Sequence, residues 1–246
     1  MPKYSCFISF LIVCLSSPVA CANIVLGGTR LIYPAGEGEV TIALANKGVT
    51  PSLVQSWMDD GATNSTPENS SAPFFVMPPI SRIEGQASQT LRILFNGAKL
   101  PEDKEAVFYL NVLEIPPVAA NSKDKNNLLL AVQSRIKVFY RPEKVKETLE
   151  EAAKTLKWHL IKEDGQWKLS CTNNSPLHIS FANIQVTKDG GSLGNKEGTH
   201  MVAPGKKEVF RLVRQDVVRT GAGDGQVQFE YINDYGALKM LSSQAI

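Results

Sequence analysis

The residues that could perform catalysis are few in this sequence, and the best match to a catalytic motif is a serine in a glycine-rich segment. Residues 190–194 read Gly-Gly-Ser-Leu-Gly, which matches the nucleophile elbow of many hydrolases. That motif places its serine on a strained turn between a strand and a helix. Here Asn-Lys-Glu-Gly follows and the neighbouring segments predict strands, so we interpret the segment as a glycine-rich loop. A hydrolase that uses Ser192 is kept as an alternative, which an active-site serine probe would test.

Metal and cofactor sites are not indicated either. His159, His178 and His200 lie far apart in the sequence on separate predicted strands, and no cysteine pair accompanies them. We expect each histidine to be a half-exposed strand residue. The sequence has no phosphate-binding loop and no dinucleotide fingerprint. The prediction is therefore a protein that is not an enzyme, with no catalytic residue, no metal and no cofactor.

The charge balance argues against a nucleic-acid partner. The 246 residues carry 26 basic and 24 acidic side chains, a net charge of +2, without a block of like charge. Nucleic-acid binding usually needs a basic face or a recognition motif, and neither is present. The length suits one or two domains.

The first 22 residues are typical of a secretory signal peptide. Lys3 is the only charged residue among them, an apolar run covers residues 7–15, and the segment ends in Ala-Cys-Ala. We predict cleavage after Ala22 and an exported, soluble protein without stable membrane insertion. One alternative is a buried N-terminal strand. Another is a lipoprotein with Cys21 as the lipidated residue, although Pro18 stands where an aliphatic residue is usual.

Cysteine usage constrains how the exported protein is stabilised. Only Cys171 of the four cysteines follows residue 22, so no intramolecular disulfide can form. We expect Cys171 to be a small buried hydrophobic residue in a strand. The fold must then be held together by burial of apolar side chains, which a domain of this size allows.

The chain after residue 22 divides into two halves that both predict strands. Short alternating strands between turn signals fill residues 23–142 and predict an antiparallel sandwich of immunoglobulin type. Residues 156–246 predict a second all-β domain. Residues 143–155 predict a linker with one short helix, because Val145 and Leu149 follow helical spacing. The strands expected in the first domain are residues 24–33, 39–46, 52–58, 73–79, 89–95, 106–115 and 128–140.

The last strand of the first domain has an unusual composition. Residues 126–140 hold no glycine or proline, and two cations, Arg135 and Lys137, lie inside the segment. A long strand with an apolar end is an aggregation hazard at a sheet edge, so the sequence raises the question of what covers it. The apolar residues that alternate along it are Leu128, Leu130, Val132, Ile136, Val138 and Tyr140.

Five segments carry a more specific signal, namely residues 27–34, 66–93, 101–117, 128–142 and 232–237. Together they resemble the periplasmic pilus chaperone family, the PapD-like proteins. The resemblance spans nearly all of the chain after residue 22 and is denser in the first domain. It implies an all-β fold of two immunoglobulin-like β-sandwich domains in a boomerang arrangement, and a periplasmic location. The short polar loop 118–127 and the lack of a cysteine pair resemble the family branch with a short F1–G1 loop, which serves rod-like pili.

The resemblance also implies a function. Such a chaperone binds and folds pilus subunits, both pilins and adhesins, by donor-strand complementation and delivers them to an outer-membrane usher for pilus assembly. The subunit lacks its last strand, and the chaperone lends one of its own. Leu128, Leu130 and Val132 match the donor residues of the family. Backbone hydrogen bonds would give sequence-tolerant affinity, and alternate side chains would set the register.

Two groups of charged residues match functional positions of the family. Arg30 and Lys137 match the cations that bind the C-terminal carboxylate of the subunit, a group that accepts several hydrogen bonds. Lys137 has the opposite parity to the donor residues, so a bulge, a twist or a cleft reached from the other face must reconcile them. Glu105, Arg141 and Asp234 match a salt bridge between the two domains.

A structural pilus subunit or adhesin with an immunoglobulin-like fold is the alternative function. Subunits usually carry a disulfide and a donor extension ahead of the fold, whereas here Cys171 is unpaired and a strand is expected from Ile24. Capture of subunits in a one-to-one soluble complex would distinguish the two. An exposed donor edge also favours self-association of the free protein, as a homodimer that caps its own edge.

Overall fold

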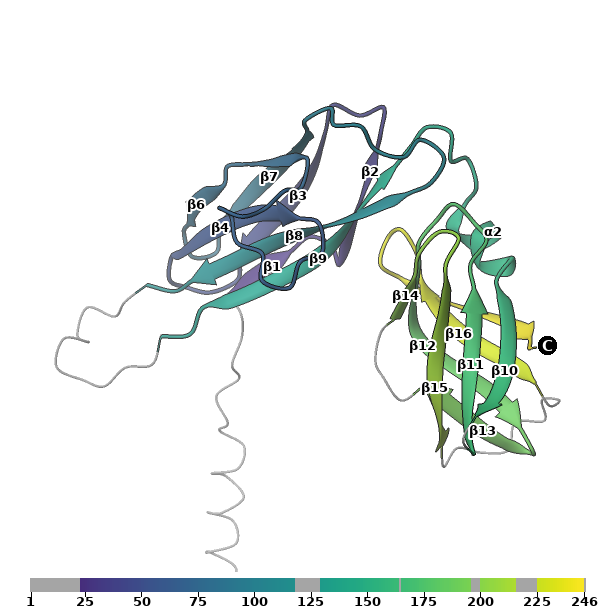
Figure 1. The fold of residues 1–246 in the computed structure, drawn as a ribbon. Helices are drawn as coiled ribbons and strands as arrows, with labels where there is room; N and C mark the ends of the chain where they lie inside the picture. Colours follow the sequence, from purple (N-terminus) through teal and green to yellow (C-terminus); the bar gives the residue numbers. More distant parts are fainter. Residues whose placement is uncertain (1–22, 118–128, 164, 196–199, 216–224, 246) are drawn as a thin grey trace, which may run out of the picture.

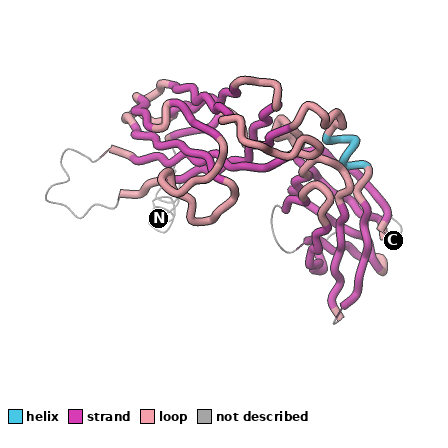
Figure 2. The backbone as a smooth tube through the Cα atoms, turned by 45° about the horizontal axis from the view of Figure 1, so that its top comes forward, coloured by secondary structure: helices cyan, strands magenta, loops and turns pink. Residues whose placement is uncertain are grey.

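The computed structural model describes residues 23–117, 129–163, 165–195, 200–215 and 225–245. They form two lobes of β-structure that meet at an angle (Figure 1 and, turned by 45°, Figure 2). The predicted all-β fold of two immunoglobulin-like domains in a boomerang arrangement is confirmed. The signal peptide with its cleavage after Ala22, the loop 118–127 and Leu128 lie outside the described residues.

The N-terminal lobe is a sandwich of two sheets around one core. The four-stranded sheet has the order β1-β3-β7-β5, and the five-stranded sheet has the order β2-β9-β8-β4-β6. The strand pairs are antiparallel, except that β2 lies parallel to β9. Alternate apolar residues of both sheets, such as Leu44, Leu91 and Leu110, are fully buried between them. The strands are β1 (Ile24–Leu26), β2 (Arg30–Pro34), β3 (Glu39–Asn46), β4 (Ser52–Asp59), β5 (Phe74–Met77), β6 (Ile80–Ile83), β7 (Ser88–Phe95), β8 (Ala106–Ile115) and β9 (Val132–Arg141).

The single strand predicted for residues 24–33 is wrong, because the chain changes sheet in the middle of it. β1 pairs with β3 in one sheet, and β2 pairs with β9 in the other. Gly27 lies at the crossing, where its backbone nitrogen donates to the carbonyl of Ala43 at 2.8 Å. A Cβ atom at Gly27 would lie 3.3 Å from the same carbonyl oxygen, so a larger residue would crowd β3. The crossing brings Arg30 beside β9.

The donor strand predicted for residues 128–140 begins later in the structure. β9 starts at Val132, where it pairs with Glu114 of β8. β8 ends one residue further on, before Pro116 and Pro117, and proline cannot continue a ladder. Leu129 and Leu130 therefore precede the strand and have no strand partner among the described residues.

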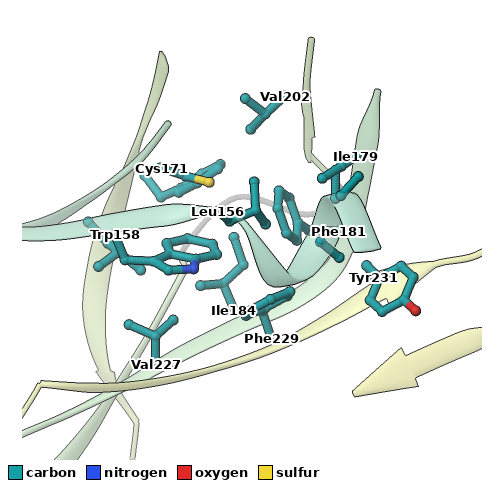
Figure 3. Close-up of a cluster of buried hydrophobic side chains, with 14 of the residues drawn as sticks. Leu156, Trp158, Cys171, Ile179, Phe181, Ile184, Val202, Val227, Phe229 and Tyr231 are labelled. Atoms are coloured by element: carbon teal, nitrogen blue, oxygen red, sulfur yellow. The ribbon is translucent and has the colours of Figure 1, made fainter. Parts of the chain in front are cut away.

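The C-terminal lobe is one eight-stranded sheet that curls around its own core. The order is β10-β11-β15-β13-β12-β16-β17, with β14 paired to β12. A bridge between Trp158 and Ala245 joins the first strand to the end of the last. Figure 3 shows the core, in which the Trp158 ring lies 5.7 Å from that of Phe181 and 5.1 Å from that of Phe229. The strands are β10 (Lys157–Glu163), β11 (Gln166–Thr172), β12 (Ile179–Lys188), β13 (Gly191–Asn195), β14 (His200–Val202), β15 (Lys207–Gln215), β16 (Gln226–Ile232) and β17 (Leu238–Gln244).

The linker between the lobes contains the helix α2 (Leu149–Lys154), which is shorter than the helical pattern of the sequence. Thr148 caps its N-terminus, and Glu151 closes a capping box with it. Leu149, Ala152 and Ala153 are buried against the C-terminal lobe, so packing supports a helix that is too short to be stable alone. No helix in the described part of the chain is long and apolar enough to cross a membrane.

The glycine-rich segment at residues 190–194 is not a loop, as the sequence suggested, but part of a hairpin. Asp189 and Gly190 form the turn with positive φ angles of 51° and 72°, and β13 follows directly. Ser192 is paired between β12 and β15 and is 8% exposed, so it does not stand on an exposed strand-to-helix elbow. Cys171 is fully buried in β11, and burial raises the pKa of its thiol to about 12.

Candidate functional site

The two faces of β9 have different surroundings along its length. Its register with β8 runs without a shift from Val132 to Tyr140, so even-numbered residues share one face. Val138 and Tyr140 on this face are buried in the core of the N-terminal lobe. The same face continues to Val132, which is 42% exposed, and the chain then reaches Leu130, which is 65% exposed. The apolar residues of this face therefore form a stripe that is buried in the core at Val138 and Tyr140 and exposed at Val132 and Leu130.

One edge of β9 is also only half occupied. β9 has ten residues, and β2 pairs with five of them, residues 137–141. The other five, residues 132–136, have β8 on one side and no strand on the other in the part of the chain that the structure describes. Unpaired backbone N–H and C=O groups on such an edge are ready to pair with an added strand.

Two cations lie where the occupied edge gives way to the free edge. Arg30 begins β2 and is directly opposite Lys137 in the parallel register. The Nη1 atom of Arg30 donates to the carbonyl of Ile232 at 2.9 Å, while its buried Nε has no hydrogen-bond partner. The Nζ of Lys137 lies 3.5 Å from the Oγ of Ser180. Within the described ranges, neither cation forms an ion pair.

Burial determines the electrostatics of this pair. Loss of hydration lowers the pKa of Arg30, and Asp234 and Glu105 oppose that shift from a distance. Burial lowers the pKa of Lys137 as well, and the positive charge of Arg30 lowers it further. Two partly desolvated cations side by side favour the binding of an anion, and a carboxylate can accept hydrogen bonds from both.

The parity conflict between Lys137 and the apolar stripe needs no bulge. Lys137 lies on the odd-numbered face of β9, which meets the C-terminal lobe through Ser180, whereas Val132 lies on the even-numbered face. A strand added at the free edge would lie in the plane of the sheet, between the two faces. Its side chains could meet the apolar stripe while its chain end meets the cations.

Three charged residues predicted together are in contact between the lobes. Arg141 at the end of β9 donates from Nε to Glu105 at 3.0 Å and from Nη1 to Asp234 at 2.7 Å. Burial would lower the pKa of Arg141, but hydrogen bonds and charge from Asp234 and Glu105 raise it. The guanidinium thus joins a carboxylate of the N-terminal lobe to one of the C-terminal lobe.

His178 belongs to this contact, and sequence reasoning missed it. The expected half-exposed strand residue is instead 6% exposed and lies just before β12. Its backbone nitrogen and its Nδ1 both lie within 3.0 Å of Oε2 of Glu105, and its ring packs against Phe139. No sequence signal identifies this contact, because Glu105 is 73 residues away.

The remaining histidines do not converge on His178. The ring of His200 packs against Phe210 at 5.0 Å, and His159 faces Ser170 across the β10–β11 hairpin. The described residues contain no group of histidine, cysteine and acidic side chains that could hold a metal ion.

Comparisons with known proteins find a matching family model for each lobe. Residues 23–146 match the model of the family described as pili and flagellar-assembly chaperone, PapD N-terminal domain, and residues 151–243 match pili assembly chaperone PapD, C-terminal domain. The chain is 36% identical over 237 residues to the probable fimbrial chaperone YadV of Escherichia coli K12, covering 95% of this chain and 94% of that protein.

Two further similarities extend this result. The chain is 37% identical over 226 residues to the chaperone protein FimB/FhaD of Bordetella pertussis, covering 90% of this chain and 88% of that protein. A solved complex of the Salmonella enterica SafA pilin with the SafB chaperone contains a chain that matches with a TM-score of 0.72 and 28% identity, over 92% of this chain and 98% of that one.

Proposed function

The chain belongs to the PapD-like family of pilus assembly chaperones, and we propose that it captures pilus subunits on the free edge of β9. Its function is that of a fimbrial chaperone, as in its relatives, so the alternative of a structural subunit or adhesin is not supported. The partner proposed here, a pilin or an adhesin, follows the chaperone–pilin complex formed by a similar protein.

One observation carries the proposal: Arg30 faces Lys137 at the residue where β2 begins and the free edge of β9 ends. A subunit strand that pairs with residues 132–136 and ends at these cations would lie in line with β2. For its C-terminal residue to reach the cations, the subunit strand must run parallel to β9, which is also the direction of β2. The C-terminal carboxylate of the subunit then supplies the missing anion.

The exposed apolar stripe supplies the second part of the interaction. Val132 and Leu130 are the donor residues that fill the groove left by the missing strand of the subunit, and Leu128 continues the series by resemblance. Burying one such side chain contributes about 1.5–3 kcal/mol. The cations fix the chain end, which sets the register, and a slip of one residue would turn every subunit side chain to the wrong face.

The contact between the lobes and the cellular setting complete the proposal. Arg141, held by Glu105 and Asp234, fixes the angle between the lobes, so that Ser180 and Ile232 stay beside the two cations. Export by the signal peptide and cleavage after Ala22 place the protein in the periplasm. There it delivers subunits to an outer-membrane usher, and without a subunit it caps its free edge as a homodimer.

Co-expression with subunits of a pilus system tests the proposal. Wild-type protein should yield a soluble one-to-one complex, and Arg30→Ala and Lys137→Ala should abolish it. Lys144→Ala, which removes an exposed ion pair with Glu102, is the matched control and should capture subunits normally. Normal capture by both Arg30→Ala and Lys137→Ala would reject the carboxylate anchor.

A further inference from the structure

Of the three cations on β9, Arg135 is the one to which the proposed function gives no role. It lies two residues before Lys137 on the same face of the strand. Its guanidinium is hydrogen-bonded to the carboxylate of Asp59 on β4 and lies 4.2 Å from the centroid of the Tyr109 ring on β8. It also donates to the carbonyl of Ala62 at 3.3 Å. Arg135 already has an anion and a ring, so it is not part of the carboxylate site formed by Arg30 and Lys137.

The partner of Arg135 is a buried and fully bonded carboxylate. Asp59 is 1% exposed, and its Oδ1 accepts from the backbone nitrogen of Gly61 at 2.7 Å as well as from Arg135. Its Oδ2 accepts from Nδ2 of Asn111 on β8, which is also 1% exposed. The exposed side chain of Arg135 is thus anchored to two buried polar groups, Asp59 on β4 directly and Asn111 on β8 through Asp59. Hydrogen bonds that involve a charged group are stronger than those between neutral groups.

A second residue of β9 enters the same network. Nε2 of Gln133 donates to Oδ1 of Asn111 at 2.8 Å. Gln133 and Arg135 are the odd-numbered residues of the free-edge half, so both point away from the apolar stripe. Hydrogen bonds thus tie this half of β9 through β8 to β4, from the odd-numbered face, which is opposite the donor residues.

We propose that Asp59, Asn111, Gln133 and Arg135 form a polar clamp that holds residues 132–136 in strand geometry before a subunit arrives. The inference rests on the proposed function, because it concerns the half of β9 that receives the subunit. This half lacks β2 on its edge, and although Ile136 packs against the core of the lobe, Val132 at the other end is exposed. A strand that is already ordered loses less entropy on binding, which raises affinity.

The position of the clamp determines what kind of effect it has. Its four residues are positioning residues that lie on the face opposite the donor residues. Loss of the clamp should therefore weaken the binding of every subunit by a similar factor. Substitution of Leu130 or Val132, which would enter the subunit groove, should instead change which subunits are preferred. A single binding assay with several subunits therefore distinguishes the positioning role of the clamp from the role of the donor residues.

Hydrogen exchange of the free protein tests the clamp without any subunit. In Arg135→Ala, the protected amides of residues 132–136 should exchange about tenfold faster, whereas those of residues 137–141 should change less than about twofold. Arg92→Ala is the matched control, because Arg92 makes an exposed ion pair with Glu39 on the other sheet. Gln133→Ala, which leaves the buried ion pair intact, should give a smaller effect in the same residues and serves if Arg135→Ala folds poorly.

Dissociation of a captured subunit gives the second readout. Arg135→Ala should release each of several subunits about five- to tenfold faster, by a similar factor for all of them. Equal acceleration of exchange in both halves of β9, or exchange that changes without faster release, would overturn the clamp. Normal capture by Arg30→Ala and Leu130→Asp would instead overturn the proposed function, and the exchange result on the free protein would still stand.

Discussion

The two halves of β9 both place apolar side chains on the even-numbered face, but their surroundings differ. Residues 137–141 lie between β2 and β8, with Val138 and Tyr140 in the core. Residues 132–136 pair with β8 alone among the described strands, and on their apolar face Ile136 still packs against the core whereas Val132 is exposed. Alternation therefore indicates a strand and the face that is apolar, but only the neighbours decide whether that face becomes core or a binding surface.

The cations of β9 show the same contrast in electrostatic terms. Arg135 and Arg141 lie on one face with Lys137 between them, and both arginines bind buried carboxylates. Within the described part of the chain, Lys137 forms no ion pair and lies near the hydroxyl of Ser180, with the cation of Arg30 beside it. Arg135 and Arg141, which have carboxylate partners, stabilise the strand and the contact between the lobes. Lys137, which forms no ion pair within the described residues, marks the place of an external anion.

The largest expected effect comes from placing a carboxylate in each half of the apolar stripe. Val138→Asp buries a charge without a partner and should destabilise the protein by about 4 kcal/mol or more, or prevent folding. Leu130→Asp should change stability by less than about 0.5 kcal/mol, because the side chain is exposed, yet it should abolish subunit capture. Urea denaturation and a capture assay measure both. Comparable destabilisation by the two variants would show that Leu130 is core.

The next largest effect concerns Arg141, which forms ion pairs with both lobes. Arg141→Ala leaves the buried Glu105 without its cation and should cost about 3–5 kcal/mol, measured by urea denaturation. X-ray scattering should show that the angle between the lobes becomes variable. Arg82→Ala, which removes an exposed ion pair with Glu84, should cost less than about 1 kcal/mol and is the control. An unchanged angle in Arg141→Ala would remove the role proposed for this salt bridge.

The smallest expected change in stability has the opposite sign. Lys137→Met removes a desolvated cation beside Arg30, so the free protein should gain about 0.5–1 kcal/mol while it loses subunit capture. The folded-state pKa of Lys137 is lowered, so the cost of its charge is full below that pKa, decreases as the pH rises past it, and is gone above the pKa of the unfolded state. The advantage of Lys137→Met in urea denaturation should shrink towards alkaline pH. A Lys137→Met variant that is less stable than the wild-type protein would contradict the conclusion that the charge of Lys137 destabilises the free protein.

Local signals in the sequence were sufficient for some elements and not for others. β8 was predicted with its observed bounds, Ala106–Ile115, because alternation and the following proline pair are both local. The sheet change after β1 was missed because Gly27 acts through contact with β3. The capping box of α2 and the Asp189–Gly190 turn are both encoded by short-range signals, namely Thr148 with Glu151 three residues later, and an Asp-Gly pair. His178 and the partner of Arg135 depend on contacts between distant segments, which no local pattern encodes.

The most direct test of the central claim is the affinity of the protein for a peptide with the sequence of a subunit's C-terminal strand. The peptide is made as the free acid and as the C-terminal amide, and binding is measured by calorimetry. The free acid should bind about 10- to 100-fold more tightly, because a charge-assisted interaction contributes roughly 1.5–3 kcal/mol, and Arg30→Ala with Lys137→Ala should abolish the difference. Equal binding of acid and amide by the wild-type protein would contradict the account.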